Sequence, residues 1–222
     1  MDSSQSSKSN RASSRRSAPP VFLTAGDCTA FLPSLGITNV WVSFDPVIDP
    51  DTSQLITGTY VTHPGYCEEG FVHSINDLSV ILLQSAPSGV TPVDLPGPGL
   101  LDSMRTAGTL KGQLFTAVGY GVQASLTGPP SFTFDGARRV ASLPFLGLPR
   151  DWLLLNQAVN ATGLGGACFG DSGSPKFIGN SNTIVAIQNW GDAPCPATSF
   201  SWRLDIASSG NFLDDYVTVP SV

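Results

Sequence analysis

The residues best suited to chemistry form a short glycine-rich segment, residues 170–175, with the sequence Gly-Asp-Ser-Gly-Ser-Pro. A serine can attack a carbonyl carbon when nearby backbone N–H groups stabilise the oxyanion that develops. We expect Gly170 and Ser172 to supply these two N–H groups, because glycine leaves room for the carbonyl oxygen to approach. The segment therefore predicts a nucleophile loop for acyl transfer, although the same residue types are also typical of a plain turn.

Two aspartates lie in segments that could assist such a serine. Asp77 opens an apolar strand over residues 78–83, where a buried carboxylate would accept a hydrogen bond and stabilise a charged imidazole. In isolation this position is equally consistent with an aspartate in a strand-opening turn. Asp27 follows Leu-Thr-Ala-Gly and directly precedes Cys28.

These segments together resemble the trypsin/chymotrypsin family of serine proteases, over about residues 21–217. The motifs are residues 170–175, Asp77 at the start of its strand, and the tripeptide Asn189, Trp190 and Gly191. The resemblance implies peptide-bond hydrolysis through an acyl-enzyme, with Ser172 as the nucleophile and Asp77 as the triad carboxylate. It also implies that a polypeptide is the substrate or ligand.

The resemblance assigns roles to further residues. Cys168 and Cys195 look like the disulfide that closes the specificity pocket, and Asp171 looks like the buried carboxylate that pairs with a freshly cleaved N-terminal amine. Substrate contacts fall to the tripeptide at 189–191, and the pocket floor falls to Gly166. Because the floor has no carboxylate, a buried Lys or Arg would lack a counter-charge. An apolar or aromatic substrate side chain is therefore expected.

The sequence departs from the family pattern at Asp27, which stands where the pattern has the catalytic histidine. A carboxylate has a reference pKa of about 3.9 and is poorly suited to accept the serine proton and return it near neutral pH. We therefore expect weak or absent turnover. The alternative is a non-catalytic homologue that keeps the cleft as a peptide-binding surface. Asp27 beside Asp77 would raise the pKa of one carboxyl.

The chain has two histidines, and neither has the sequence context of the missing base. His63 lies in a Thr-His-Pro-Gly-Tyr segment that resembles a surface loop, which predicts a structural role. His73 precedes Asp77 by four residues and is the alternative candidate for a substitute base.

The elements that must position these residues are predicted to be strands. The chain of 222 residues is 41% hydrophobic and only 13% charged, with 23 Gly and 18 Pro, which favours an all-β class with many tight turns. Strands are expected in two halves, residues 19–110 and 111–222, corresponding to the two barrels of one chymotrypsin-like peptidase domain. Residues 206–217 have helical spacing, so a short C-terminal helix is expected.

The amino-terminal region departs from the family in a second way. Residues 1–18 are rich in Ser and Arg and are expected to be a disordered tail. Without the usual two strands ahead of residue 21, the first barrel is expected to be incomplete, leaving strand edges open to association of an otherwise monomeric protein. Cys28 and Cys67 are left free, paired with each other, or paired between chains.

Composition and charge disfavour several other classes. The net charge of -6 argues against a nucleic-acid or anionic-membrane partner, and the apolar runs are too short to span a bilayer. The cysteine and histidine spacings fit no zinc motif, and the glycines at 163, 165 and 166 fit no phosphate loop, so no metal and no cofactor are expected. Residues 1–18 lack the apolar core of a signal peptide, whereas the family resemblance implies an extracellular location.

Overall fold

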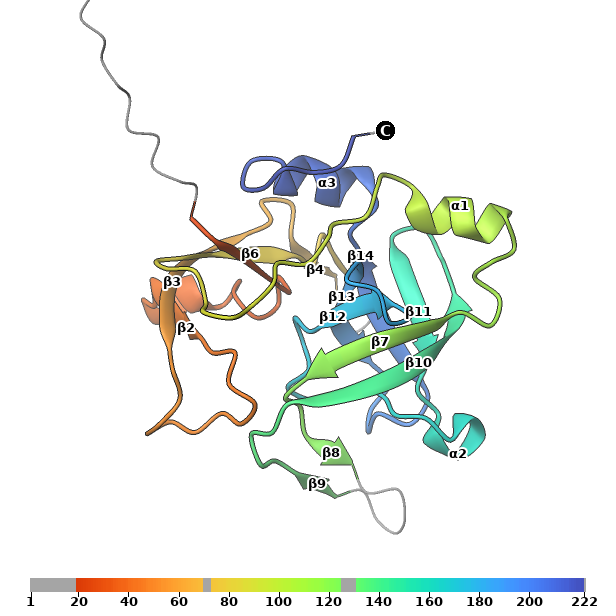
Figure 1. Ribbon diagram of the computed structural model, residues 1–222, viewed down its shortest axis with the longest axis horizontal. Helices are drawn as coiled ribbons and strands as arrows, with labels where there is room; N and C mark the ends of the chain where they lie inside the picture. Colours follow the sequence, from red (N-terminus) through yellow and green to blue (C-terminus); the bar gives the residue numbers. More distant parts are fainter. Residues whose placement is uncertain (1–18, 70–72, 125–130, 222) are drawn as a thin grey trace, which may run out of the picture.

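The computed structural model describes residues 19–69, 73–124 and 131–221 (Figure 1). The expected tail, residues 1–18, lies outside the described residues. The described chain is mainly β, which confirms the predicted class. Its strands are divided between an open sheet in the first half and a closed barrel in the second.

The first half is a four-stranded antiparallel sheet with the order β1-β6-β3-β2. Alternating side chains give β2 one buried face, because Val42 is buried and Trp41 is 63% exposed. A short hairpin, β4-β5, and a 3-10 helix at Leu32–Leu35 complete this half. The strands are β1 (Val21–Thr24), β2 (Asn39–Val42), β3 (Ile56–Thr62), β4 (Cys67–Glu69), β5 (His73–Ile75) and β6 (Ser79–Leu83).

The second half is a closed six-stranded barrel with the order β10-β11-β14-β13-β12-β7. Its apolar core includes Phe115, Leu143, Leu153 and Leu155, which are all fully buried. The strands are β7 (Leu114–Gly119), β10 (Arg139–Gly147), β11 (Trp152–Asn156), β12 (Pro175–Ile178), β13 (Ile184–Gly191) and β14 (Thr198–Arg203), with a separate hairpin of β8 (Gln123–Ala124) and β9 (Phe132–Thr133).

A shared core joins the two halves. It combines Leu78 and Val80 of the first half with Trp152 and Trp202 of the second, and Phe212 of the terminal helix packs against them. Burying large apolar and aromatic side chains is the main favourable contribution to such packing. The site-bearing segments of the two halves are therefore held in a fixed relation.

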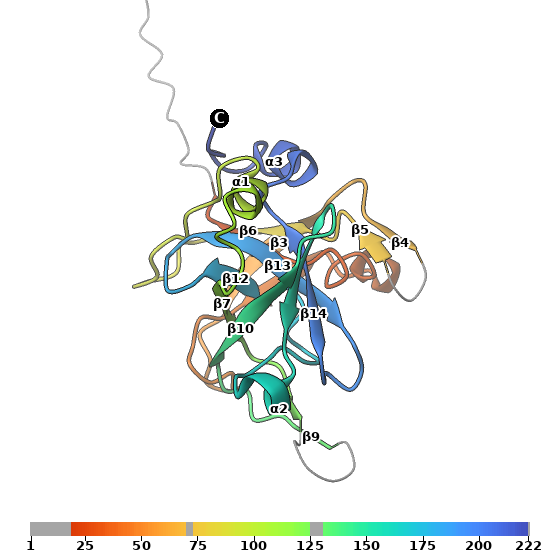
Figure 2. The ribbon, with the colours of Figure 1, turned by 90° about the vertical axis from the view of Figure 1, so that its right-hand side faces the viewer.

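In the described part of the chain, three α-helices lie outside the sheets: α1 (Leu100–Thr106), α2 (Val159–Thr162) and α3 (Ala207–Leu213). In both views α1 and α3 lie at one end of the molecule and α2 lies at the opposite end (Figures 1 and 2). The predicted C-terminal helix is confirmed, with α3 shorter than expected. None of the described helices is long and apolar enough to cross a bilayer.

The helix α1 was not expected from the sequence. A residue distant in the sequence supplies the acceptors at its start. The Leu101 N–H donates to Asp205 Oδ2 at 2.7 Å, and the Gly99 N–H donates to the Asp205 carbonyl oxygen at 2.8 Å. The first N–H groups of a helix need such acceptors. A partner more than a hundred residues away leaves no local signal.

Candidate active site

The loop at residues 168–174 leads into β12. Backbone hydrogen bonds within the loop and to β13 hold its conformation. Gly170 and Gly173 have φ values of 89° and 84°, a region that favours glycine. The Gly173 N–H donates to the Gln188 carbonyl oxygen at 2.7 Å, and the Ser174 N–H donates to that of Asp171 at 2.9 Å. Among the described residues, neither Gly170 N–H nor Ser172 N–H donates to a protein atom. Both donors predicted for an oxyanion hole are therefore available.

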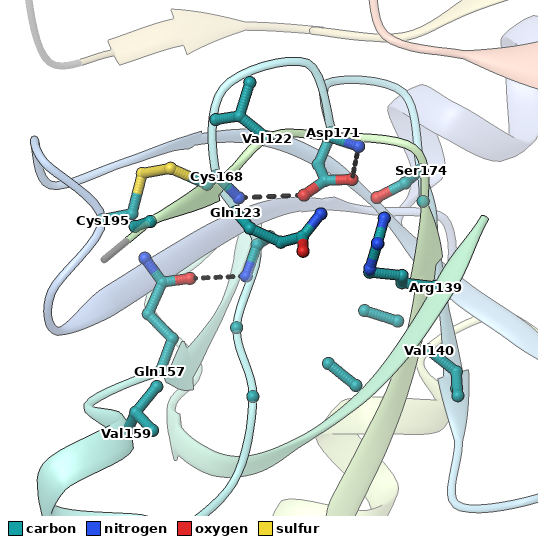
Figure 3. A pocket seen from close by; sticks show the side chains of 18 residues that line it. Val122, Gln123, Arg139, Val140, Gln157, Val159, Cys168, Asp171, Ser174 and Cys195 are labelled. Atoms are coloured by element: carbon teal, nitrogen blue, oxygen red, sulfur yellow. Dashed lines mark hydrogen bonds between the residues drawn. A yellow bond between two sulfur atoms is a disulfide. The ribbon is translucent and has the colours of Figure 1, made fainter. Parts of the chain in front are cut away.

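The half-buried carboxylate of Asp171 stabilises this loop by accepting two backbone hydrogen bonds. Its Oδ1 accepts the Gly121 N–H and its Oδ2 accepts the Cys168 N–H, each at 2.9 Å. It lines a cavity of about 320 Å³, together with Ser174 and Arg139 (Figure 3). A Cβ on Gly121 would collide with the Asp171 carboxyl, so this close approach requires glycine.

Ser172 is half-buried, and its hydroxyl donates a hydrogen bond to the Asn189 carbonyl oxygen at 3.0 Å. The Asp27 carboxyl lies beside it. Burial raises the pKa of Asp27, while hydrogen bonds with Cys28 and Ser172 act in the opposite direction. Oδ1 of Asp27 is buried and accepts no hydrogen bond from the described residues. The structure thus brings the predicted nucleophile together with Asp27.

Asp77 completes this group and is only 1% exposed. Its Oδ1 accepts the backbone N–H of Asp27 at 2.9 Å. Burial, reinforced by the charge of Asp27, raises the pKa of Asp77 to about 7. Two carboxyls this close titrate as a pair, so near neutral pH the pair retains a proton.

Asn189 joins Asp77 to the barrel by hydrogen bonds. Its Nδ2 donates to the Asp77 carbonyl oxygen at 2.7 Å, and its Oδ1 accepts the Trp202 N–H at 2.7 Å. The sequence assigned Asn189 to substrate binding. In the structure its side chain is buried between the two halves, and its backbone carbonyl oxygen is the part that faces Ser172.

A second cavity, of about 170 Å³, opens beside Ser172. Trp190 and Gly191, which the sequence assigned to substrate contacts, line it, and the Trp190 ring stacks on Phe200 with ring centroids 3.6 Å apart. The predicted disulfide between Cys168 and Cys195 is present, and both cysteines line the same cavity. Gly166, the predicted floor, instead lines the neighbouring larger cavity.

Gln157 lines both cavities, and sequence reasoning missed it. It directly follows β11. Its side chain packs against Gly166, since a Cβ on that glycine would lie 2.6 Å from Gln157 Cβ. The glycine at position 166 was the sequence feature that could have indicated a neighbouring side chain there, because glycine leaves the space that Gln157 fills.

His63 makes its contacts outside this group, whereas the Cys28 thiol is hydrogen-bonded to Asp27. The contacts of His63 are with Ser208, Gly65 and the ring of Phe212, and burial lowers the pKa of its imidazole. The side chain of His73 lies outside what the structure describes. Cys28 and Cys67 are free. Within the described ranges, no three His, Cys, Asp or Glu residues gather to hold a metal ion.

Comparison with known proteins shows a likeness of fold alone. No family model matches the chain, and no curated protein matches its sequence. The chain is similar to the solved structure of HL collagenase, with a TM-score of 0.66 and 14% identity over 89% of this chain and 82% of that one. It is also similar to neuropsin, a serine protease expressed in the limbic system of mouse brain, with a TM-score of 0.62 and 18% identity over 89% and 85% of the two chains. The architecture is therefore that of the trypsin-like serine proteases.

Proposed function

We propose that the chain is a serine endopeptidase homologue that acylates on Ser172 and turns over slowly. The observation that supports this most strongly is the pair of unbonded N–H groups, at Gly170 and Ser172, beside a serine that lines a cavity. Two N–H groups in this arrangement would stabilise an oxyanion at an attacked carbonyl. The substrate is a polypeptide.

In this reaction Ser172 Oγ bonds to the carbonyl carbon and the peptide C–N bond breaks. The hydroxyl proton passes to Asp27 and then to the leaving amine, and water later hydrolyses the ester. Asp27 stands where the trypsin-like pattern has histidine. Loss of that histidine in a serine protease costs about 10⁶ in kcat, while about 10³ to 10⁴ over water survives. The pKa of Asp27, raised by burial, recovers part of the lost basicity.

A second candidate is a peptide-binding protein that does not cleave its ligand. The observation in its favour is the Ser172 hydroxyl, which donates a hydrogen bond to the Asn189 carbonyl oxygen at 3.0 Å. A hydroxyl held in this way must rotate before a base can take its proton.

An extracellular location accompanies either candidate. The Cys168–Cys195 disulfide is stable in oxidising compartments, which fits secretion.

Labelling with a fluorophosphonate separates the two candidates, because this reagent reports whether a serine is nucleophilic. We expect slow but stoichiometric labelling at Ser172, located by peptide mass spectrometry, and none in Ser172→Ala. A chain that stays unlabelled over a day yet binds peptides would support the second candidate instead.

A further inference from the structure

The most unusual polar group beside the candidate site is the side-chain amide of Gln157, which is 1% exposed. Its Oε1 accepts the Ala167 N–H at 3.1 Å, and its backbone N–H donates to the Ala197 carbonyl oxygen at 2.8 Å. The first bond orients the side-chain amide, and the second holds the backbone of Gln157. Its Nε2 is buried and has no hydrogen-bond partner among the described residues.

This nitrogen belongs to a residue that lines the cavity next to Ser172. Figure 3, which draws the larger neighbouring cavity, shows the oxygen of Gln157 in its hydrogen bond and the nitrogen on the side of Cys195. A Cβ on Gly191 would lie 3.3 Å from Nε2, so glycine at this position keeps the approach to the nitrogen open. Both Gly191 and Gln157 line the 170 Å³ cavity.

A buried N–H donor without an acceptor costs free energy, so native proteins rarely keep one without a ligand or water to pair with it. The neighbouring glutamine, Gln188, shows the usual situation. Its Oε1 accepts the Ser199 hydroxyl at 2.6 Å and its Nε2 donates to the Trp190 carbonyl oxygen at 2.9 Å. Of the two buried glutamines that line the cavity, only Gln157 has a donor to spare.

The charges around the cavity restrict the acceptor. Asp192 lines it, and its carboxylate already accepts the Thr198 N–H at 2.5 Å. No Lys or Arg is present among the described lining residues. A substrate carboxylate would therefore meet a like charge without a compensating cation. A neutral carbonyl oxygen meets no such cost, and Trp190 offers an apolar wall for the methylene groups of its side chain.

We propose that Gln157 Nε2 donates a hydrogen bond to a side-chain carbonyl oxygen of the ligand, so that the cavity selects glutamine or asparagine at the residue whose carbonyl group meets Ser172. This inference rests on the proposed function of the site. It replaces the expectation of an apolar side chain, which considered the missing carboxylate at Gly166 and not the amide of Gln157.

Peptide binding tests the proposal without requiring turnover. In a Ser172→Ala background, matched peptides with Gln, Met or Glu at the selected position are compared by titration calorimetry. We expect the Gln peptide to bind about tenfold to a hundredfold more tightly than the Met peptide, which has similar size and no acceptor. The Glu peptide should bind more weakly than the Gln peptide.

Two variants separate a specificity role from a structural one. Gln157→Met removes the donor, so the Gln and Met peptides should then bind within about twofold of each other. It also removes the Oε1 acceptor of the Ala167 N–H, so Tm should fall, and the ratio of the two peptide affinities is the readout of the specificity role. Gln188→Met is the matched control: it breaks satisfied hydrogen bonds, so it should lower Tm while the preference for the Gln peptide remains.

Equal binding of Gln and Met peptides, a preference that survives Gln157→Met, or no binding at millimolar concentration would overturn the inference. Labelling of Ser172 without such a preference would leave the proposed function standing and reject the role of Gln157. The preference without any labelling would support the role of Gln157 and point to the binding protein.

Discussion

The two halves of the molecule contribute to the site in different ways. The second half is a closed barrel whose loop at 168–174 is held by its own backbone bonds, by Asp171 and by a disulfide. The first half is an open sheet with two free cysteines, and it contributes Asp27 and Asp77. Among the described residues, no backbone–backbone hydrogen bond of the loop at 168–174 involves residue 27. The backbone conformation of the serine loop therefore does not depend on a backbone bond to residue 27.

The strongest test of this difference between the halves is Asp27→His. An imidazole beside Ser172 and Asp77 would act as the missing general base, and we expect labelling and peptide cleavage to rise by about 10² to 10⁴-fold. The rates follow from fluorophosphonate labelling and from cleavage monitored by mass spectrometry. Asp27→Asn, which is isosteric but not basic, should give no gain. If histidine gives none either, the barrel loop is not competent by itself.

A second test uses pH on the first half. Because the pKa of Asp77 is raised to about 7, the folded state holds a proton that the unfolded state releases near pH 4. This contribution to stability is full below pH 4 and is lost as the pH rises toward 7, by up to about 4 kcal/mol. Urea unfolding at several pH values should show the decline. Asp77→Asn should flatten it, and an unchanged slope would show that Asp77 is ionised in the fold.

Removal of the disulfide tests the second half, because among the described residues only that half contains one. The Cys168–Cys195 bond closes a loop with a sequence separation of 27. Removing it by a double change to Ala should cost between about 3 and 4 kcal/mol of unfolding free energy. The same change at Cys28 and Cys67 should have a much smaller effect. Equal losses would contradict the difference between the halves.

Lys176 offers the smallest of these tests and also concerns the barrel. It is 0% exposed, in register with Ala117 and Ala186, and its Nζ has no hydrogen-bond partner in the described chain. Burial lowers the pKa of Lys176 to about 7, against the opposing effect of Asp171. Its lowered pKa favours folding above about pH 10, and this contribution is lost as the pH falls toward 7. Lys176→Met should remove that alkaline rise and stabilise the fold at pH 7 by about 1 to 3 kcal/mol, measured by urea unfolding. A loss of stability would mean that the ammonium is paired through water.

The sequence predicted those features that depend on local pattern. The apolar strand after Asp77 was visible because its residues form a continuous buried run, and the segment at 170–175 was visible because its turn requires glycines. Gln157 and Lys176 were not visible, because polar residues in strand segments are usually exposed and only barrel closure buries them here. The start of α1 could not be predicted for a related reason, because the acceptors of its first N–H groups belong to Asp205, which is distant in the sequence.

Asn189 bonds to the Asp77 carbonyl oxygen with its side-chain amide and to the Ser172 hydroxyl with its backbone carbonyl oxygen. Asn189 thus holds Asp77 of the first half and Ser172 of the second half at a fixed distance, without itself taking part in the proposed reaction. Neither of these bonds involves residue 27, so a substitution there leaves both of them in place. The chain is therefore a practical scaffold for installing other proton-transfer groups at position 27.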